Sequence, residues 1–463
     1  MIPDAWSATA ADDLSSSPLE PLLTREYDAD PAVVRERLRG RYGPVAPVDL
    51  LGVPVWFVLG YDEVRYVLQN VGGNWSKRPG NWRAYAEGRI PVDWPLTTLF
   101  QADNSSFMDG DVHQAYRGAW ISALRPYQDH TQPQAQTLDR AMERYCDDLI
   151  GLVTEGGPTG LADLAAQYAR PLPLMVANHL LGVSSAHGDD MVMDIWRVLD
   201  AGPDAAAHHR LHAAFMELAA AKRRDPGQDI PSYLLQAKPD LTDDELTREL
   251  FVLPAFLDFT AGLICNVILE VITDPRTRAT LSMGAAEEAV NRVAMVNPVL
   301  TNLAFRFART DLKLGRFRIA AGDPVMLSIA GAHADPRFAA ALPQDALRGT
   351  RAHLAWGAGA YGCPSQRLAT RIVTIAVRRL FARFSALTPA LPPDQLPWRP
   401  SLFVRALRSL PVRYEAAPSL TPTPAPTPAA PHAAPRPTPD ADGGWQPSRS
   451  GLWAFLRKLR RGQ

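Results

Sequence analysis

The chain has 463 residues, of which 46 % are hydrophobic and 21 % charged, so it can bury a large core as one big domain or as several smaller ones. Its formal net charge of −1 gives no reason to expect nucleic-acid binding. Its three scattered cysteines, Cys146, Cys265 and Cys363, exclude a disulfide framework and a zinc knuckle, and they suit a reducing cytoplasm.

The predicted elements are mostly helical. Residues 30–70 predict a helix, a short β-hairpin and a second helix, and helical periodicity dominates residues 112–300. Residues 313–329 predict short strands joined by turns. A long amphipathic helix follows Cys363, with Pro364 in its first turn, where a missing N–H costs nothing. The fold class predicted is therefore mainly α with a small β portion.

One segment, residues 251–272, is almost long and apolar enough to span a membrane. It carries Pro254, Asp258, Asn266 and Glu270, and its flanks have mixed charge. Because an aspartate inside a membrane is costly, a central helix buried in a large α-rich protein explains the segment better.

The C-terminal region changes in composition. Residues 416–448 are rich in Pro, Ala and Thr, cannot build a core, and predict a disordered, extended linker. Residues 449–463 place apolar side chains on one helical face and basic ones on much of the rest. Such a helix predicts docking to a membrane surface or an acidic partner, and a solvated tail of marginal helicity is the other interpretation. We therefore expect a globular domain over residues 1–415, followed by the linker and this helix.

Residues 353–369, HLAWGAGAYGCPSQRLA, contain two competing patterns. Gly357, Gly359 and Gly362 spell G-x-G-x-x-G, but no buried strand precedes them and no acidic residue follows roughly 20 positions later, so a dinucleotide site fails. The same loop brings Cys363 directly ahead of a helix, whose N-terminal amides stabilise a thiolate. A thiolate bound to haem iron favours cleavage of an O–O bond. The loop therefore favours haem-thiolate chemistry.

Other stretches extend this pattern. Trp356, Gly359 and Cys363 spell aromatic-x-x-Gly-x-x-x-Cys, and His113 and Arg117 spell His-x-x-x-Arg on one helix face. On these motifs, together with the stretch FRFARTDLKLGRFRIAAGDPVMLSIAGAHADPRF, the sequence resembles the cytochrome P450 family over residues 25–415.

The resemblance implies a cytochrome P450-like fold that binds haem b (iron protoporphyrin IX) through Cys363. It implies that the haem propionates lie near His113, Arg117, Arg306 and Tyr361, the last of which stands where the family usually has His or Arg. It further implies a cytoplasmic monooxygenase that oxidises a small apolar substrate with electrons from a ferredoxin or flavin-type donor. The basic tail adds the expectation of peripheral attachment at the inner membrane surface.

The oxygen-activating motif departs from the family. The run that matches Ala-Gly-x-Asp/Glu-Thr has Asp258 as its acid, whereas Phe259 replaces the threonine. Phe259 cannot donate a hydrogen bond, and Thr260, one residue later, would need a local helix distortion, which Pro254 could supply. We expect Asp258 and Thr260 to be the catalytic residues. The alternative function is a haem-binding scaffold or sensor with weak or no monooxygenase activity, docked through its tail to a membrane or signalling complex.

The K-helix motif, usually Glu-x-x-Arg, is altered as well. Glu288 is followed by Asn291, and Arg292 comes one position late. Because positions i+3 and i+4 both face residue i, we expect Arg292 to pair with Glu288, near the meander arginine Arg348.

Overall fold

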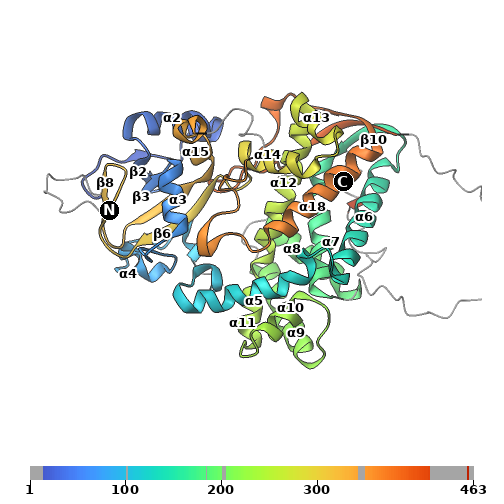
Figure 1. The fold of residues 1–463 in the computed structure, drawn as a ribbon, viewed down its shortest axis with the longest axis horizontal. Coiled ribbons are helices and arrows are strands. Elements are labelled where there is room, and N and C mark those ends of the chain that lie inside the picture. The colour runs from blue at the N-terminus through green and yellow to red at the C-terminus, as the bar shows by residue number, and fades with distance from the viewer. Residues whose placement is uncertain are drawn as a thin grey trace, which may run out of the picture.

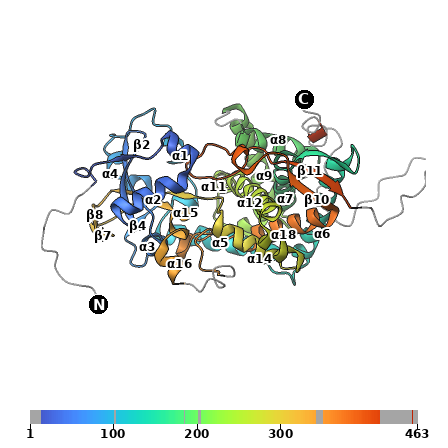
Figure 2. The same ribbon diagram turned by 90° about the horizontal axis from the view of Figure 1, so that it is seen from above.

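The computed structural model describes residues 14–100, 103–183, 185–200, 205–341, 350–417 and 456–457. Two lobes lie side by side, one built around a sheet and one built of helices (Figures 1 and 2). Each lobe has its own hydrophobic core. Apart from residues 416–417 of the predicted linker and 456–457 of the predicted tail, these two segments lie outside the described residues, as does Arg348.

The sheet lobe confirms the helix, hairpin and helix predicted for residues 30–70. Its six-stranded mixed sheet has the order β1-β2-β3-β9-β6-β4, and its core packs around buried aromatic side chains. Its helices are α1 (Arg25–Ala29), α2 (Pro31–Tyr42), α3 (Tyr61–Gln69), α4 (Arg83–Ala86), α15 (Ile329–His333) and α16 (Pro336–Ala340). Its strands are β1 (Glu20–Pro21), β2 (Val45–Leu50), β3 (Val53–Val58), β4 (Trp75–Ser76), β6 (Asn302–Ala308) and β9 (Pro324–Ser328), with a separate ribbon of β7 (Leu312–Leu314) and β8 (Phe317–Ile319).

The helical lobe packs its helices around one central helix, α12. Its helices are α5 (Gly110–Gln128), α6 (Pro133–Thr154), α7 (Pro171–Leu181), α8 (Ser185–Asp200), α9 (Ala205–Arg224), α10 (Ile230–Ala237), α11 (Asp243–Leu250), α12 (Leu253–Thr273), α13 (Pro275–Ser282), α14 (Ala286–Val296) and α18 (Gln366–Arg383). An antiparallel sheet of the order β10-β11-β5 covers one end, built from β10 (Phe384–Pro389), β11 (Pro411–Ala416) and β5 (Thr159–Asp163).

Helix α12 is the central buried helix predicted from residues 251–272. Among the described residues, only the stretch Asp243–Thr273 is long and apolar enough to cross a membrane, and 72 % of its most apolar window is buried inside the protein. Burying an aliphatic side chain stabilises a fold by roughly 2 kcal/mol, so α12 is explained as the core of this lobe.

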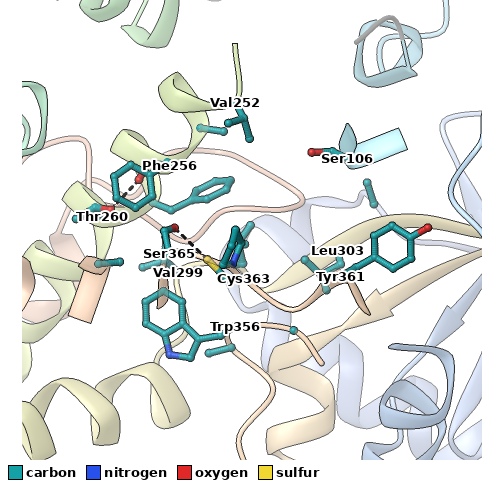
Figure 3. Close-up of a pocket in the computed structure, with 18 of the residues that line it drawn as sticks. Ser106, Val252, Phe256, Thr260, Val299, Leu303, Trp356, Tyr361, Cys363 and Ser365 are labelled. Atoms are coloured by element: carbon teal, nitrogen blue, oxygen red, sulfur yellow. Dashed lines mark hydrogen bonds between the residues drawn. The ribbon is translucent and has the colours of Figure 1, made fainter. Parts of the chain in front are cut away.

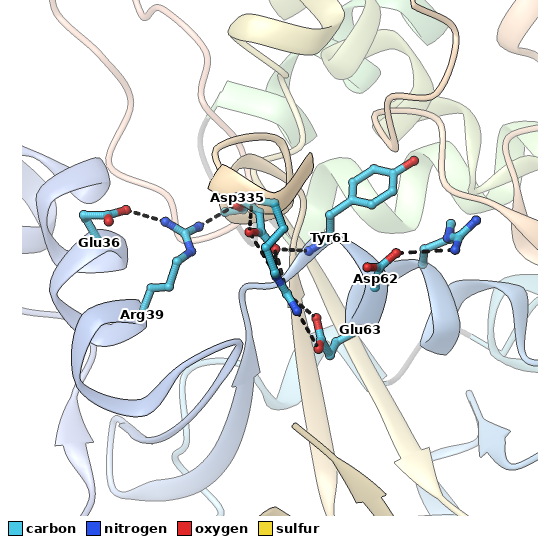
Figure 4. Close-up of polar contacts among 9 residues, drawn as sticks. Glu36, Arg39, Tyr61, Asp62, Glu63 and Asp335 are labelled. Carbon is cyan, nitrogen blue, oxygen red and sulfur yellow. Dashed lines mark hydrogen bonds and ion pairs between the residues drawn. The ribbon is translucent and has the colours of Figure 1, made fainter. Parts of the chain in front are cut away.

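A polar network joins the helices of the sheet lobe (Figure 4). Arg337 forms ion pairs with Glu63 on α3 at 2.7 Å and with Asp335 at 2.8 Å. Asp335 also accepts the backbone N–H of Tyr61, and Arg39 of α2 donates to a backbone carbonyl of α15. These contacts link α2 to α15 and α3 to α16.

The cysteine loop, residues 353–365, packs against the end of α3. Gly359 has a φ of +67°, which favours glycine, and a Cβ built there would lie 2.8 Å from Gln69 Cα and from the Leu68 carbonyl oxygen. The loop is followed by α18, as predicted, although the helix begins at Gln366, so that Pro364 precedes it instead of lying in its first turn. Glycine at position 359 thus allows the backbone of this loop to touch the sheet lobe directly.

The expected pair of Glu288 with Arg292 is wrong. Arg292 turns toward α13, where it lies 3.5 Å from Asp274 and donates to Thr277 at 3.2 Å. Glu288 instead pairs with Arg351, just ahead of the cysteine loop, at 2.5 Å. The reason is that Arg292 faces the aspartate that caps α13, a partner that sequence spacing along α14 does not show.

Candidate active site

A cavity of about 590 Å³ lies between the two lobes. Helices α5 and α12, strand β6 and the cysteine loop all contribute to its walls, which are mostly apolar. Of the predicted site residues, it is lined by His113, Arg117, Thr260, Arg306, Tyr361 and Cys363, and Asp258 is not among its lining residues. The topology therefore brings together residues that are up to 250 positions apart in the sequence.

Cys363 lies at the surface of this cavity (Figure 3). Its backbone N–H donates to the Trp356 carbonyl at 2.7 Å, which closes the loop, and its Sγ lies 3.3 Å from the hydroxyl of Ser365. The other two cysteines are buried in the helical core, where burial raises the pKa of Cys146 and of Cys265 to about 12. They are therefore thiols at neutral pH, and Cys363 is the cysteine available to a metal.

Positive charge gathers at one end of the cavity. Arg306 is buried and donates only to backbone carbonyls of its own strand, and burial lowers its pKa to about 10. Lys77 also lines the cavity, with its ammonium 5.1 Å from the centre of the Tyr361 ring. Burial and the nearby Arg306 hold the pKa of Lys77 well below its usual value. In the part of the chain that the structure describes, neither side chain forms an ion pair. The charge of Asp109 attracts both, but Asp109 pairs with Arg309 at 2.9 Å.

A neutral imidazole and a further cation complete this cluster. His113 is buried on α5, and its pKa is lowered to about 4 by burial and by the charges of Lys77 and Arg117. Arg117, one turn later, donates to the Gly362 carbonyl in the cysteine loop. Unpaired charges cost free energy when they are taken out of water, so such a cluster fits a ligand that brings its own negative charge. The two propionates of haem fit it.

Tyr361 contacts other groups of the protein. Its hydroxyl lies 2.8 Å from an Asp109 carboxylate oxygen and 2.7 Å from the Met108 carbonyl. Its ring contacts that of His113, with centroids 4.0 Å apart and the ring planes tilted by 31°. The Tyr361 hydroxyl therefore has its hydrogen-bond partners within the protein. Asp109 is itself held in place by an ion pair with Arg309 at 2.9 Å. Tyr361 ties the cysteine loop to the start of α5.

The wall formed by α12 is mostly apolar and includes two phenylalanines (Figure 3). Phe256 and Phe259 line the cavity, and the Thr260 hydroxyl donates to the Phe256 carbonyl at 2.7 Å. Asp258 points elsewhere: its two oxygens accept from Arg399 at 2.9 and 2.5 Å, beside a separate, much smaller cavity. Asp258 therefore lies on another face of the helix than the cavity, held there by a partner 141 residues away.

Sequence reasoning missed Lys77 and Arg399. Lys77 stands in a stretch without helical or strand periodicity, and Arg399 in a proline-rich connection between β10 and β11. No sequence signal distinguishes either residue from a solvated surface charge. Only the tertiary fold places Lys77 at the cavity and Arg399 beside Asp258 of α12.

Several bacterial proteins are similar to this chain in sequence and in structure. Cytochrome P450 107B1 of Saccharopolyspora erythraea is 30 % identical over 381 residues, covering 78 % of this chain and 90 % of that protein. The cytochrome P450 monooxygenase PikC of Streptomyces venezuelae is 29 % identical over 411 residues, covering 85 % and 93 %. The solved structure of CYP154A1 from Streptomyces coelicolor A3(2) superposes with a TM-score of 0.70 at 30 % identity, covering 85 % of this chain and 98 % of that one. No family model matches the chain.

The unpaired ammonium of Lys77 predicts a role in retaining haem. Replacing Lys77→Met should speed haem loss by about tenfold, because one charge-assisted contact to a propionate disappears. Haem transfer to excess apomyoglobin measures this rate without any turnover, and Lys77→Arg should keep it near the parent value. Lys238→Met is the matched control, because Lys238 also lies over an aromatic ring but pairs with Asp240 outside the cavity. Equal rates for Lys77→Met and the parent would contradict the assignment.

Proposed function

This chain belongs to the cytochrome P450 family, a family of haem b monooxygenases, and we propose that Cys363 is the thiolate ligand of its iron. The observation that carries this proposal is the place of Cys363 on the cavity between the lobes, beside a cluster of cations without carboxylate partners. Electrons come from a ferredoxin-type partner, and the substrate is a small organic molecule.

The basic side chains at the cavity would hold haem in two ways. Arg306 and Lys77 supply buried positive charge for the propionates, and His113 and Arg117 add donors from one face of α5. When bound, haem supplies an iron centre for oxygen chemistry, to which a thiolate ligand lends electron density. Tyr361, held by Asp109, positions the cysteine loop in place of the histidine or arginine that the family usually has there.

The walls support an apolar substrate. Phe107, Val252, Phe256, Leu303 and Phe403 line the cavity, and the hydroxyls of a few serine and threonine side chains interrupt them. Relatives include a 6-deoxyerythronolide B hydroxylase and a vitamin D(3) 25-hydroxylase. We propose that this chain likewise hydroxylates a largely apolar molecule, which its aromatic walls would hold by shape and by excluding water.

Proton delivery depends on Thr260 in this proposal. Its hydroxyl hydrogen is engaged by the Phe256 carbonyl, and its oxygen keeps lone pairs that accept a hydrogen bond from a substrate hydroxyl or a water in the cavity. Asp258, paired with Arg399, keeps its proton-accepting oxygens out of the cavity and serves to fix α12. A substrate hydroxyl would therefore complete the relay that the family's threonine supplies.

The scaffold or sensor alternative is not favoured, because the relatives are named monooxygenases and hydroxylases. The tail remains a separate proposal. We propose that residues 449–463 attach this cytoplasmic enzyme peripherally to an anionic membrane surface, with an acidic protein as the other candidate. Arg457 is exposed and lies 3.7 Å from Glu155, while Leu456 is buried against the helical core, so part of this segment rests on the protein itself.

The thiolate assignment is tested by spectroscopy. The reduced protein should bind CO with a thiolate-type Soret band, and Cys363→Ala should lose that band, because no other cysteine reaches the cavity. Cys265→Ala, which removes a buried core thiol, is the control and should keep the band. A Cys363→Ala protein with the parent spectrum would disprove the proposal.

The proton relay predicts opposite effects at neighbouring positions. Phe259→Thr should raise the product formed per electron consumed, because it restores a hydroxyl where the family has one. Thr260→Val, which keeps the shape but removes the hydroxyl, should lower that ratio several-fold. Asp258→Asn should lower the free energy of unfolding by about 1–3 kcal/mol, since it leaves Arg399 without its carboxylate. It should change the product formed per electron consumed less than Thr260→Val does. Unchanged coupling in both Phe259→Thr and Thr260→Val would rule out this relay.

The tail predicts vesicle binding that is separable from the haem site. Deleting residues 449–463 should abolish binding to anionic vesicles and leave the haem spectrum unchanged, because the basic side chains are lost and the cavity is not touched. Vesicles of neutral lipid are the control and should bind neither protein. If the shortened protein sediments with anionic vesicles as well as the full chain does, the tail has no anchoring role.

A further inference from the structure

The middle of α14 contacts the cysteine loop through an uncharged side chain. Asn291 is buried there. Its amide makes two hydrogen bonds, one to Thr350 just ahead of the cysteine loop and one to His353, the first residue of the loop. Its Nδ2 donates to the Thr350 carbonyl at 3.0 Å, and its Oδ1 lies 2.9 Å from Nε2 of His353. The charged neighbours Glu288 and Arg292 make no such buried contact, because Glu288 pairs with exposed Arg351 and Arg292 pairs with Asp274.

The direction of these bonds fixes the protonation of His353. Because a carbonyl only accepts, the amide nitrogen of Asn291 must face Thr350, and Oδ1 must accept from His353. His353 therefore carries a proton on Nε2. Burial favours the neutral ring, since it lowers the pKa of His353 to about 4.

A second imidazole lies next to the first. His333, at the end of α15, has Nδ1 at 2.8 Å from the Met295 carbonyl in the last turn of α14, and its Nε2 accepts the Leu354 N–H at 2.8 Å. The carbonyls of a last helical turn lack partners within the helix, so His333 satisfies one of them. The rings of His333 and His353 lie 6.1 Å apart. Residues 353 and 354 are thus held to α14 from two sides.

Backbone hydrogen bonds connect residues 353 and 354 to the residue that carries the sulfur, Cys363. The Leu354 carbonyl accepts the Gly357 N–H at 2.9 Å, and the Trp356 carbonyl accepts the Cys363 N–H at 2.7 Å. Groups that orient a metal ligand tune its strength and geometry, even though they never touch the metal. A loop that moves here would move the ligand.

We infer that Asn291 and His353, supported by His333, are positioning residues that keep Cys363 in place as the iron ligand in this chain. Their amide and imidazole groups, and not the charged side chains of Glu288 and Arg292, make the hydrogen bonds to residues 350–354. The inference rests on the proposed role of Cys363 as the thiolate ligand.

The experiment compares matched variants of the full-length haem protein. Asn291→Leu keeps the volume but removes both hydrogen bonds, and His353→Leu removes one, whereas His353→Gln restores an N–H donor toward Asn291. Arg292→Leu, on the same helix but turned to α13, is the control for general damage. The reduced CO complex is followed over time, together with haem content and melting temperature.

Asn291→Leu and His353→Leu should convert the thiolate-type Soret band to the protonated-thiol type at least about tenfold faster than the parent, and His353→Gln should slow this again. Arg292→Leu should lower the melting temperature without speeding the conversion. Should Asn291→Leu fail to fold, the His353→Leu and His353→Gln pair decides alone. Parent-like conversion in both leucine variants, or equal conversion in Arg292→Leu, would overturn the inference. A parent protein without a thiolate-type band would refute the role of Cys363 itself.

Discussion

One sulfur atom has to be held at the junction of two separately packed lobes, and the rest of the structure serves that constraint. The loop that carries Cys363 touches the sheet lobe through Gly359, is tied to α5 by Tyr361 and Asp109, and is joined to α14 through Asn291 and His353. Each contact comes from a different element, so the loop is held from several directions. This arrangement suits a ligand whose proton must stay off and whose distance to a metal must stay fixed.

Much of the fold and part of the site could be predicted, because short stretches of the sequence carry the patterns that specify them. The hairpin over 45–58, helix α12 and helix α18 are indicated by the spacing and composition of their apolar residues. The glycines and the aromatic residue around Cys363 indicate a tight loop before a helix. His113 and Arg117 share a helix face by spacing alone, so their joint arrival at the cavity follows from the sequence.

The side-chain contacts that the sequence did not predict join segments that are far apart in the chain. Asp258 sits at the expected position in α12, yet Arg399 in a connection far along the chain holds it away from the cavity. Arg292 is one residue from the family's position, and the aspartate that caps α13 captures it. Lys77 joins the cation cluster from an irregular stretch between β4 and α4, where no pattern marks a buried charge. Side-chain pairing across the interior is a tertiary property, and a single sequence carries no record of it.

The cluster of cations also bears on how the protein is made. An unliganded chain would have to keep Lys77 and Arg306 buried without an anion, or let this corner of the lobe junction open to water. Any group that binds only the folded form pulls the folding equilibrium toward it. Maturation of the polypeptide is thereby coupled to cofactor supply, so cells short of iron or of tetrapyrrole would accumulate a loosened, protease-sensitive chain in place of a stable empty enzyme.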